Sequence, residues 1–113
     1  MQLIAQQASI VTAQQAAAQY NVQAVRTGDG DAYDYVAAQL TPYVRLVSGP
    51  LGTTLWVNEQ PYCWAPTARD SDSNEKPMLY VRTVKKGDFT VCKGMRVTLQ
   101  KYNEAVAAVL ATV

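Results

Sequence analysis

The chain has 113 residues, of which 49% are hydrophobic and 17% are charged, and its formal net charge is +1. This length fits one domain, residues 1–113, with a single core, and is too short for two ordinary domains. A net charge so close to zero excludes a global field that would draw the protein to nucleic acid or to an anionic membrane, so any electrostatic role must come from local clusters.

The first part of the chain, residues 1–40, is predicted to be helical. Ala and Gln dominate residues 2–25 and neither Pro nor Gly interrupts them, a composition that favours a helix. A second short helix is expected from Asp31, as its N-cap, to Leu40, because Pro42 prevents its continuation. The uncharged start is less apolar than a membrane span and lacks the basic residues of an export signal, so we expect a protein made in the cytoplasm.

Residues 43–99 are predicted to form a β-rich core. Short runs of β-type residues between Gly, Pro and Lys turns predict strands at 43–47, 53–57, 78–84, 89–92 and 95–99. Alternation gives the runs apolar faces made by Val44 and Leu46, Leu55 and Val57, Leu79 and Val81, and Met95, Val97 and Leu99. The sequence therefore predicts an antiparallel sheet or small barrel of about five strands with one buried side.

A short helix is predicted at the C-terminal end, over residues 100–113. Its apolar positions recur at helical spacing, at Tyr102, Val106, Leu110 and Val113. Together these elements predict one α+β domain with an N-terminal helical segment, a sheet and a terminal helix.

The chain lacks residues on which most enzyme classes depend. It contains no histidine, which removes the commonest general base, the usual partner of a catalytic serine or cysteine, and the commonest metal ligand. Cys63 and Cys92 lie far apart without C-x-x-C spacing, so we expect both to be reduced and buried. The sequence therefore predicts a protein that is not an enzyme and holds no cofactor.

Asp70, Asp72 and Asn74 follow the alternate spacing of the first ligands in a calcium-binding loop. The match then fails, because Glu75 stands where the loop needs glycine and Val81 where it needs a bidentate carboxylate. Ser, Asp and Asn also favour turns for local reasons. We interpret the segment as a solvated loop and predict no metal site.

The charged residues are unevenly distributed along the chain. All of them lie between Arg26 and Glu104, so residues 1–25 and 105–113 carry none. A helix that faces water usually carries Lys and Glu, whereas an uncharged Ala and Gln surface allows another subunit to approach closely. We therefore predict that the first helix contacts a partner through Ile4, Val11, Gln14 and Ala18.

Two further clusters are candidate binding surfaces. Trp56 and Trp64 belong to an aromatic segment, residues 56–64, that suits an interface or a ligand groove, and alternation places Trp56 opposite the apolar face of its strand. Residues 82–101 are basic, which is typical either of a solvated hairpin or of a surface that follows a phosphate backbone. The basic residues are Arg82, Lys85, Lys86, Lys93, Arg96 and Lys101.

In size and layout the chain resembles the small virion proteins of tailed bacteriophages, of the head-decoration or head-to-tail neck type, and residues 78–91 are most like them. The resemblance implies a non-enzymatic structural subunit that clamps neighbouring capsid shell or neck proteins, occurs in symmetric copies and is located in the virion. The charge distribution favours the same class of protein. The competing hypothesis is a small binding module, for nucleic acid through residues 82–101 or for a ligand through residues 56–64.

We predict that folding does not depend on calcium, because residues 70–74 do not complete a coordination set. Adding calcium, or removing it with a chelator, should leave the melting temperature of the protein unchanged in a thermal unfolding experiment. A calcium-dependent rise in the melting temperature that Asp70→Asn abolishes would contradict this expectation.

Overall fold

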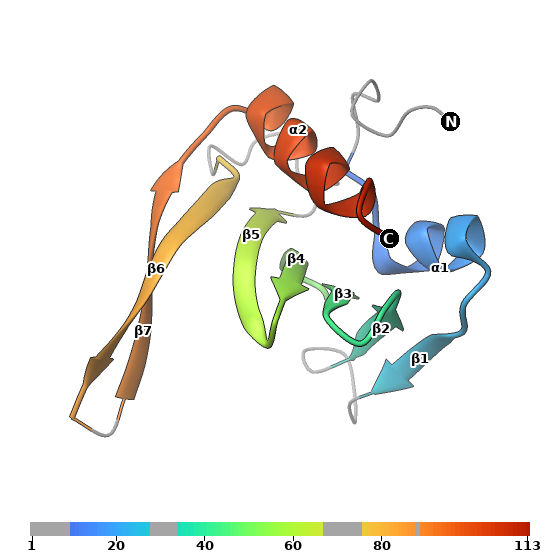
Figure 1. The fold of residues 1–113 in the computed structure, drawn as a ribbon, viewed down its shortest axis with the longest axis horizontal. Helices are drawn as coiled ribbons and strands as arrows, with labels where there is room; N and C mark the ends of the chain where they lie inside the picture. The colour runs from blue at the N-terminus through green and yellow to red at the C-terminus, as the bar shows by residue number, and fades with distance from the viewer. Residues whose placement is uncertain (1–9, 28–33, 67–75, 88) are drawn as a thin grey trace.

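The computed structural model describes residues 10–27, 34–66, 76–87 and 89–113, with the backbone alone for residues 81–86 and 89–92. This part of the chain forms two helices and seven strands (Figure 1): α1 (Ala13–Tyr20), β1 (Ala24–Thr27), β2 (Tyr35–Gln39), β3 (Val44–Ser48), β4 (Gly52–Val57), β5 (Gln60–Pro66), β6 (Met78–Lys86), β7 (Phe89–Arg96) and α2 (Leu99–Leu110). The strands form one antiparallel sheet in which their spatial order, β1 to β7, is their order along the chain.

The predicted α+β class is confirmed, but the sheet is larger than expected and open. It has seven strands where about five were predicted, and β1 and β7 are its two edges, so it is not a barrel. The predicted strands 89–92 and 95–99 are one strand, β7, which ends at Arg96, and Leu99 begins α2 instead. β5 was not predicted as a strand, and it contains two prolines, which are uncommon in a strand that has neighbours on both sides.

Helix α1 is much shorter than the predicted helix over residues 2–25, of which residues 2–9 lie outside the described part. Thr12 caps its start in a capping box: the Thr12 hydroxyl accepts from the Gln15 amide at 3.2 Å, and the Gln15 side chain accepts from the Thr12 amide at 3.0 Å. Asn21, with φ of 57°, ends the helix in the left-handed conformation that asparagine tolerates. Helix propensity is a weak preference, and these two caps override it.

The second predicted helix, from Asp31 to Leu40, is wrong: Tyr35–Gln39 is strand β2, and Asp31 lies outside the described residues. Pairing with β1 on one side and β3 on the other satisfies the backbone of β2. Ala38 in β2 is fully buried against α1, where Ala16 is fully buried as well. Because both side chains are small, the helix lies close to the strand, and this packing outweighs the helix propensity of alanine.

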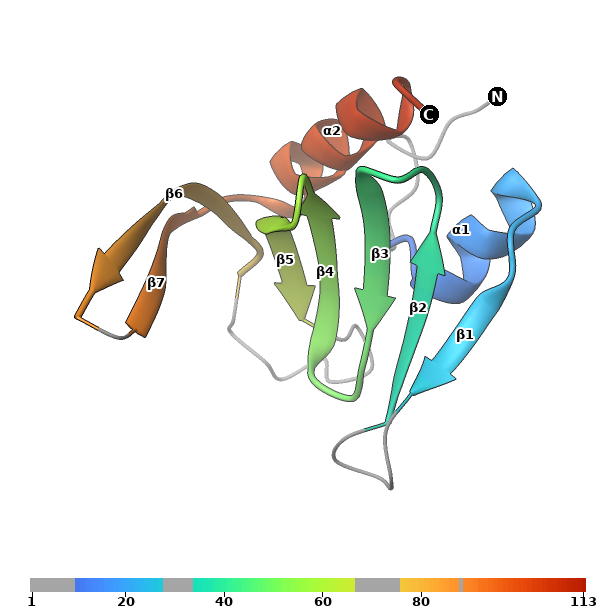
Figure 2. The same ribbon diagram turned by 60° about the horizontal axis from the view of Figure 1, so that its bottom comes forward.

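The hydrophobic core lies between the two helices and one face of the sheet, which we call the inner face. A cross-strand row of fully buried side chains runs along this face, from Ala38 through Leu46 and Leu55 to Cys63. Helix α1 packs against the β2 and β3 end of the sheet, and α2 packs against β5 (Figure 2). Each helix therefore covers a different part of the same face.

The predicted terminal helix is confirmed as α2. The Thr98 hydroxyl accepts from the Lys101 amide at 3.1 Å and caps its start. Its inward side is made by Tyr102, Val106 and Leu110, at the predicted helical spacing. No helix in the described residues is long and apolar enough to cross a membrane.

Among the described residues, Tyr102 and Cys63 are ionisable groups that are fully buried in the core. Burial raises the pKa of the Cys63 thiol from its ordinary value of 9.0 to about 12. Burial, with a smaller contribution from Cys63, also raises the pKa of the Tyr102 hydroxyl. This hydroxyl has no hydrogen-bond partner among the described residues. Both groups are therefore neutral in the folded protein well beyond the pH at which they ionise in the unfolded chain.

We predict that the protein loses stability as the pH rises from about 9 towards 12. The unfolded chain releases the thiol proton near pH 9 and the folded protein does not, so the stability that is complete below pH 9 is lost above it. Each such group contributes up to about 1.4 kcal/mol per pH unit. Urea unfolding at pH 8 and pH 10.5 measures the loss. A loss equally large in Cys63→Ala/Tyr102→Phe would show that these groups are not its cause.

Candidate interaction surface

The opposite face of the sheet, which we call the outer face, has no helix over it in the described part of the chain (Figure 2). A continuous cross-strand row of uncharged side chains runs across it from the first strand to the sixth. The strand registers place in this row Val25, Ala37, Val47, Thr54, Trp64 and Met78. An antiparallel sheet with one face in water normally carries polar residues there. An apolar row on this face is therefore typical of a surface with a partner.

Charge on the outer face is low and is neutralised locally. Among the residues that alternation turns outward on β2, β3 and β4, Arg45 is the only charged one. Its guanidinium carbon lies 4.9 Å from the centre of the Trp56 ring, and its Nη1 lies 3.4 Å from a carboxylate oxygen of Glu59. Trp56 therefore packs beneath a cation that already has an anionic partner.

A shallow hollow of about 220 Å³ lies on the outer face beside the turn between β3 and β4, lined by Tyr35, Val47 and Trp64 among others. Glycines in the turn let the rings approach the backbone. A Cβ on Gly49 would lie 2.6 Å from the Tyr35 ring, and one on Gly52 would lie 2.6 Å from Nε1 of Trp64. The hollow is smaller than most small-molecule pockets, so it fits a protein interface better than a ligand site.

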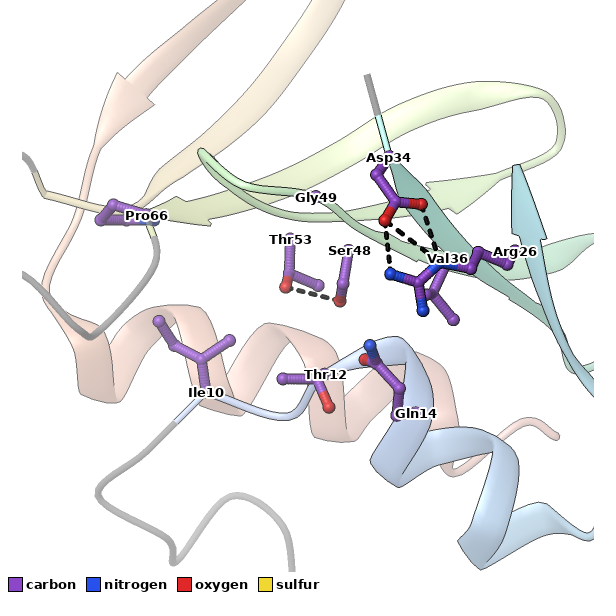
Figure 3. Close-up of a pocket in the computed structure, with 10 residues that line it drawn as sticks. All are labelled: Ile10, Thr12, Gln14, Arg26, Asp34, Val36, Ser48, Gly49, Thr53 and Pro66. Carbon is purple, nitrogen blue, oxygen red and sulfur yellow. Dashed lines mark hydrogen bonds and ion pairs between the residues drawn. The ribbon is translucent and has the colours of Figure 1, made fainter. Parts of the chain in front are cut away.

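A larger cavity, of about 290 Å³, lies on the inner face between the start of α1 and the sheet (Figure 3). Its polar groups bind one another. Ser48 Oγ accepts from the Ala13 amide at 2.8 Å and lies 2.8 Å from Thr53 Oγ1. The Arg26 guanidinium forms an ion pair with Asp34, whose hydrogen bond and charge raise the pKa of Arg26. These contacts pair Ser48 with Thr53 and Arg26 with Asp34 inside the cavity.

Strands β6 and β7 form a two-stranded ribbon, which we call the arm, that leaves the rest of the sheet (Figure 1). Only two residue pairs join β6 to β5, Cys63 with Leu79 and Trp64 with Met78, whereas β6 pairs with β7 as far as Lys86 with Phe89. The register shifts between Tyr80 and Arg82, so that the strand has one extra residue there. Such a bulge bends and twists a strand, which explains the departure of the arm.

Gly94 lies opposite the bulge, where a Cβ would come within 2.7 Å of the Leu79 carbonyl oxygen. Its lack of a side chain permits this close crossing of the two strands. Beyond it, Met95 is 54% exposed, so its predicted place on the buried face is wrong. Helix α2 packs against β5, so the covered part of the inner face ends where β6 and β7 leave the sheet.

The predicted partner residues fall on both sides of the molecule. Gln14 and Ala18 are exposed on α1, while Trp56 and Trp64 are half-buried on the outer face, so they do not form one surface. Val11 is buried in the core of its own domain and is therefore not available to a partner. Ile4 lies outside the described residues.

Most of the predicted basic residues lie on the arm. Arg82 and Lys93 are direct partners in the ladder, and Lys85 and Lys86 precede the turn at its tip. Arg96 ends β7 at the base, where its guanidinium donates to the Lys76 carbonyl oxygen at 2.9 Å. Lys101 is separate, because it lies in the first turn of α2.

Neither the cysteines nor the acidic residues supply a metal site in the part of the chain that the structure describes. Cys63 is a free, buried thiol, as predicted, and the side chain of Cys92 is not described. Asp70, Asp72 and Asn74 lie outside the described residues. No group of three potential metal ligands occurs in the remainder.

The sequence interpretation missed the part of the outer row that comes from β1 and β2, because both strands lie in residues predicted to be helical. Two features of the sequence indicate that the first predicted helix was too long. Thr12 and Gln15 have the spacing of a capping box, which starts a helix at residue 13, and Asn21 is a residue that commonly ends one. A helix limited by these signals leaves Val25 and Ala37 free to belong to strands.

Comparison of the chain with protein-family models, with curated proteins and with solved structures found no match in any of the three. The functional proposals below therefore depend on the surfaces themselves.

We predict that Val11→Asp destabilises the monomer and that Ala18→Asp does not. The first change buries a carboxylate in the core and should lower the free energy of unfolding by about 3 kcal/mol or more. The second adds the same charge to an exposed position of α1 and should change it by about 0.5 kcal/mol. Urea unfolding of both variants tests this, and equal midpoints would show that Val11 is not a core residue.

Proposed function

We propose that the protein is a non-enzymatic structural subunit that assembles with copies of itself through the outer face of its sheet. The observation that carries the proposal is the uncharged row from Val25 to Met78, on a face that no described helix covers. Val25 in the row is 50% exposed, and Tyr35, which alternation places on the same face, is 40% exposed, so this face presents apolar side chains to water. Packing against a partner removes that exposure.

A second copy of the chain is the partner that this face fits best. In a two-fold dimer the same patch contacts itself, so a charged patch would place like charges together. Here the outward cation of β3, Arg45, is already paired with Glu59 and Trp56, and the row beside it is neutral. Two such faces can therefore pack as a sheet-on-sheet sandwich without repulsion.

The area of the face predicts a dimer of modest affinity. Five strands about 4.8 Å apart, each with about five residues rising about 3.3 Å, give a flat face of roughly 400 Å² per copy. Two copies would bury roughly 800 Å², without the additional surface of side chains that protrude from the flat face. This is close to the lower limit of roughly 1,000 Å² for specific interfaces. We therefore expect a weak dimer that further contacts in an assembly reinforce.

A virion is the assembly that we propose, with phage capsid shell or neck proteins as the further partners. The small size of the chain and its lack of histidine support a structural role over a catalytic one. Its outward α1 surface, which includes Gln14 and Ala18, bears no charge and stays accessible when two outer faces pack together. This helix surface is therefore a second contact, available to neighbouring proteins on the opposite side.

We predict concentration-dependent self-association that Val47→Asp abolishes. Val47 lies in the middle of the row, and a carboxylate there would be buried in the interface without a partner. Sedimentation velocity over a wide range of protein concentrations measures the monomer and dimer populations. Val25→Asp, at a half-exposed position of the edge strand, is a second variant that should fold and remain monomeric.

Ala18→Asp is the matched control, because it adds the same charge on the side of the molecule that faces away from the outer face. It should dimerise as the unmodified protein does. The proposal of a sheet-face dimer fails if the protein is monomeric at all concentrations, or if Ala18→Asp blocks association and Val47→Asp does not.

A further inference from the structure

The arm is the part of the fold that self-association through the outer face does not explain. Beyond Tyr80, the only strand neighbour of β6 in the described chain is β7, and the arm projects from one end of the molecule (Figures 1 and 2). From Tyr80 to Lys86 it extends by roughly 20 Å. An isolated two-stranded ribbon is only marginally stable in water, so an arm of this length is typical of an element that lies against a partner.

The arm also carries half of the ten basic residues of the protein. Residues 78–96 contain five basic residues and one acidic residue, a net charge of +4, while the whole chain has +1, so the remaining residues together carry −3. The near-neutral net charge is therefore the sum of a basic arm and an acidic remainder of the chain. A local cluster of this kind creates an attractive field for a polyanion although the total charge does not.

The strand register concentrates this charge. Arg82 and Lys93 are direct partners across the ladder, a placement of like charges that destabilises a sheet unless an anion lies nearby. Lys85 and Lys86 lead into the tip, where Lys86 pairs with Phe89 across a two-residue turn. Gly87 begins this turn with φ of 60°, which glycine adopts without strain, and so keeps the tip narrow.

We propose that the arm binds duplex DNA by entering the major groove, with its basic residues contacting the phosphates on either side. The major groove of B-form DNA is about 12 Å wide and admits a two-stranded β-ribbon. The deep, narrow major groove of duplex RNA does not admit it in the same way. A binding mode that depends on phosphates needs positive charge along a narrow element, as the arm has, and does not depend on base sequence.

The test measures binding of the full chain to a fluorescently labelled DNA duplex of about 30 base pairs and mixed sequence, by fluorescence anisotropy at several salt concentrations. If the four basic residues Arg82, Lys85, Lys86 and Lys93 each contact a phosphate, the logarithm of the association constant should fall with the logarithm of the salt concentration with a slope of about −3 to −4. Duplex RNA of the same length should bind more weakly.

Lys85→Glu/Lys86→Glu should weaken binding by roughly tenfold or more at low salt and reduce the steepness of the salt dependence. The matched control is Lys76→Glu/Lys101→Glu, which makes the same change in net charge at two exposed positions outside the arm and should retain most of the affinity. Circular dichroism and thermal unfolding should give the same results for both variants. Lys85→Gln/Lys86→Gln provides a milder change if the charge reversal impairs folding.

The proposal is overturned if the protein does not bind duplex DNA at low salt, or if both double variants weaken binding equally, because the arm would then have no special role. It is also overturned if the arm variant binds DNA normally but no longer self-associates, which would make the arm a protein contact. Val47→Asp separates the two proposals, since it should prevent dimer formation and leave the affinity of the monomer for DNA intact.

Discussion

The fold depends on the packing of two helices against one face of a seven-stranded sheet. The buried row from Ala38 to Cys63 has α1 over one end and α2 over the other, and this single layer of contacts contains the core. Small side chains on α1 and β2 allow close approach at the first end, while Tyr102, Val106 and Leu110 fill the space at the second. Both described helices pack on this one face, and the other face of the sheet has no described helix over it.

The two proposed contact regions follow from this one-sided arrangement. The row from Val25 to Met78 on the outer face is uncharged although no described helix covers it, and among the outward residues of β2, β3 and β4 the one charge is Arg45, which packs over Trp56. The arm extends past the end of the core, since in the described chain two residue pairs join it to β5 and α2 packs against β5. An uncharged face suits contact between copies, and a basic ribbon suits a polyanion. A subunit with both could connect neighbouring copies to nucleic acid within one assembly.

The sequence predicted the regular parts of the fold well and the N-terminal third badly. β3, β4 and the β6–β7 hairpin were recognised because their alternating apolar residues are separated by glycine, proline and lysine turns. α2 was recognised because its inward residues recur at helical spacing. Alanine and glutamine content indicated helix up to residue 25, and Asp31 with Pro42 indicated a second helix over residues 31–40, so the strands β1 and β2 were missed. Alanine serves there as a small residue beneath a helix, a use that composition does not reveal.

The residues of the candidate contact surfaces were also predicted only in part. Trp56, Trp64 and the basic residues of the arm were identified from the sequence, because aromatic clusters and runs of charge are visible in it. Their grouping was not predictable. Val11 was expected to contact a partner but lies in the core, whereas Val25, Ala37 and Val47 form one row only because strands distant in the sequence pair in a particular register.

By itself, the sequence determined the α+β class, the terminal helix, the basic hairpin and the absence of a histidine-dependent mechanism. These features depend on residue type and on local spacing, both of which can be read directly from the sequence. Tertiary structure alone decided which sheet face the helices cover, how far the arm projects and which uncharged side chains share a surface. Those features arise from the pairing of strands and the packing of α1 and α2, which bring together residues tens of positions apart, and no local pattern encodes them.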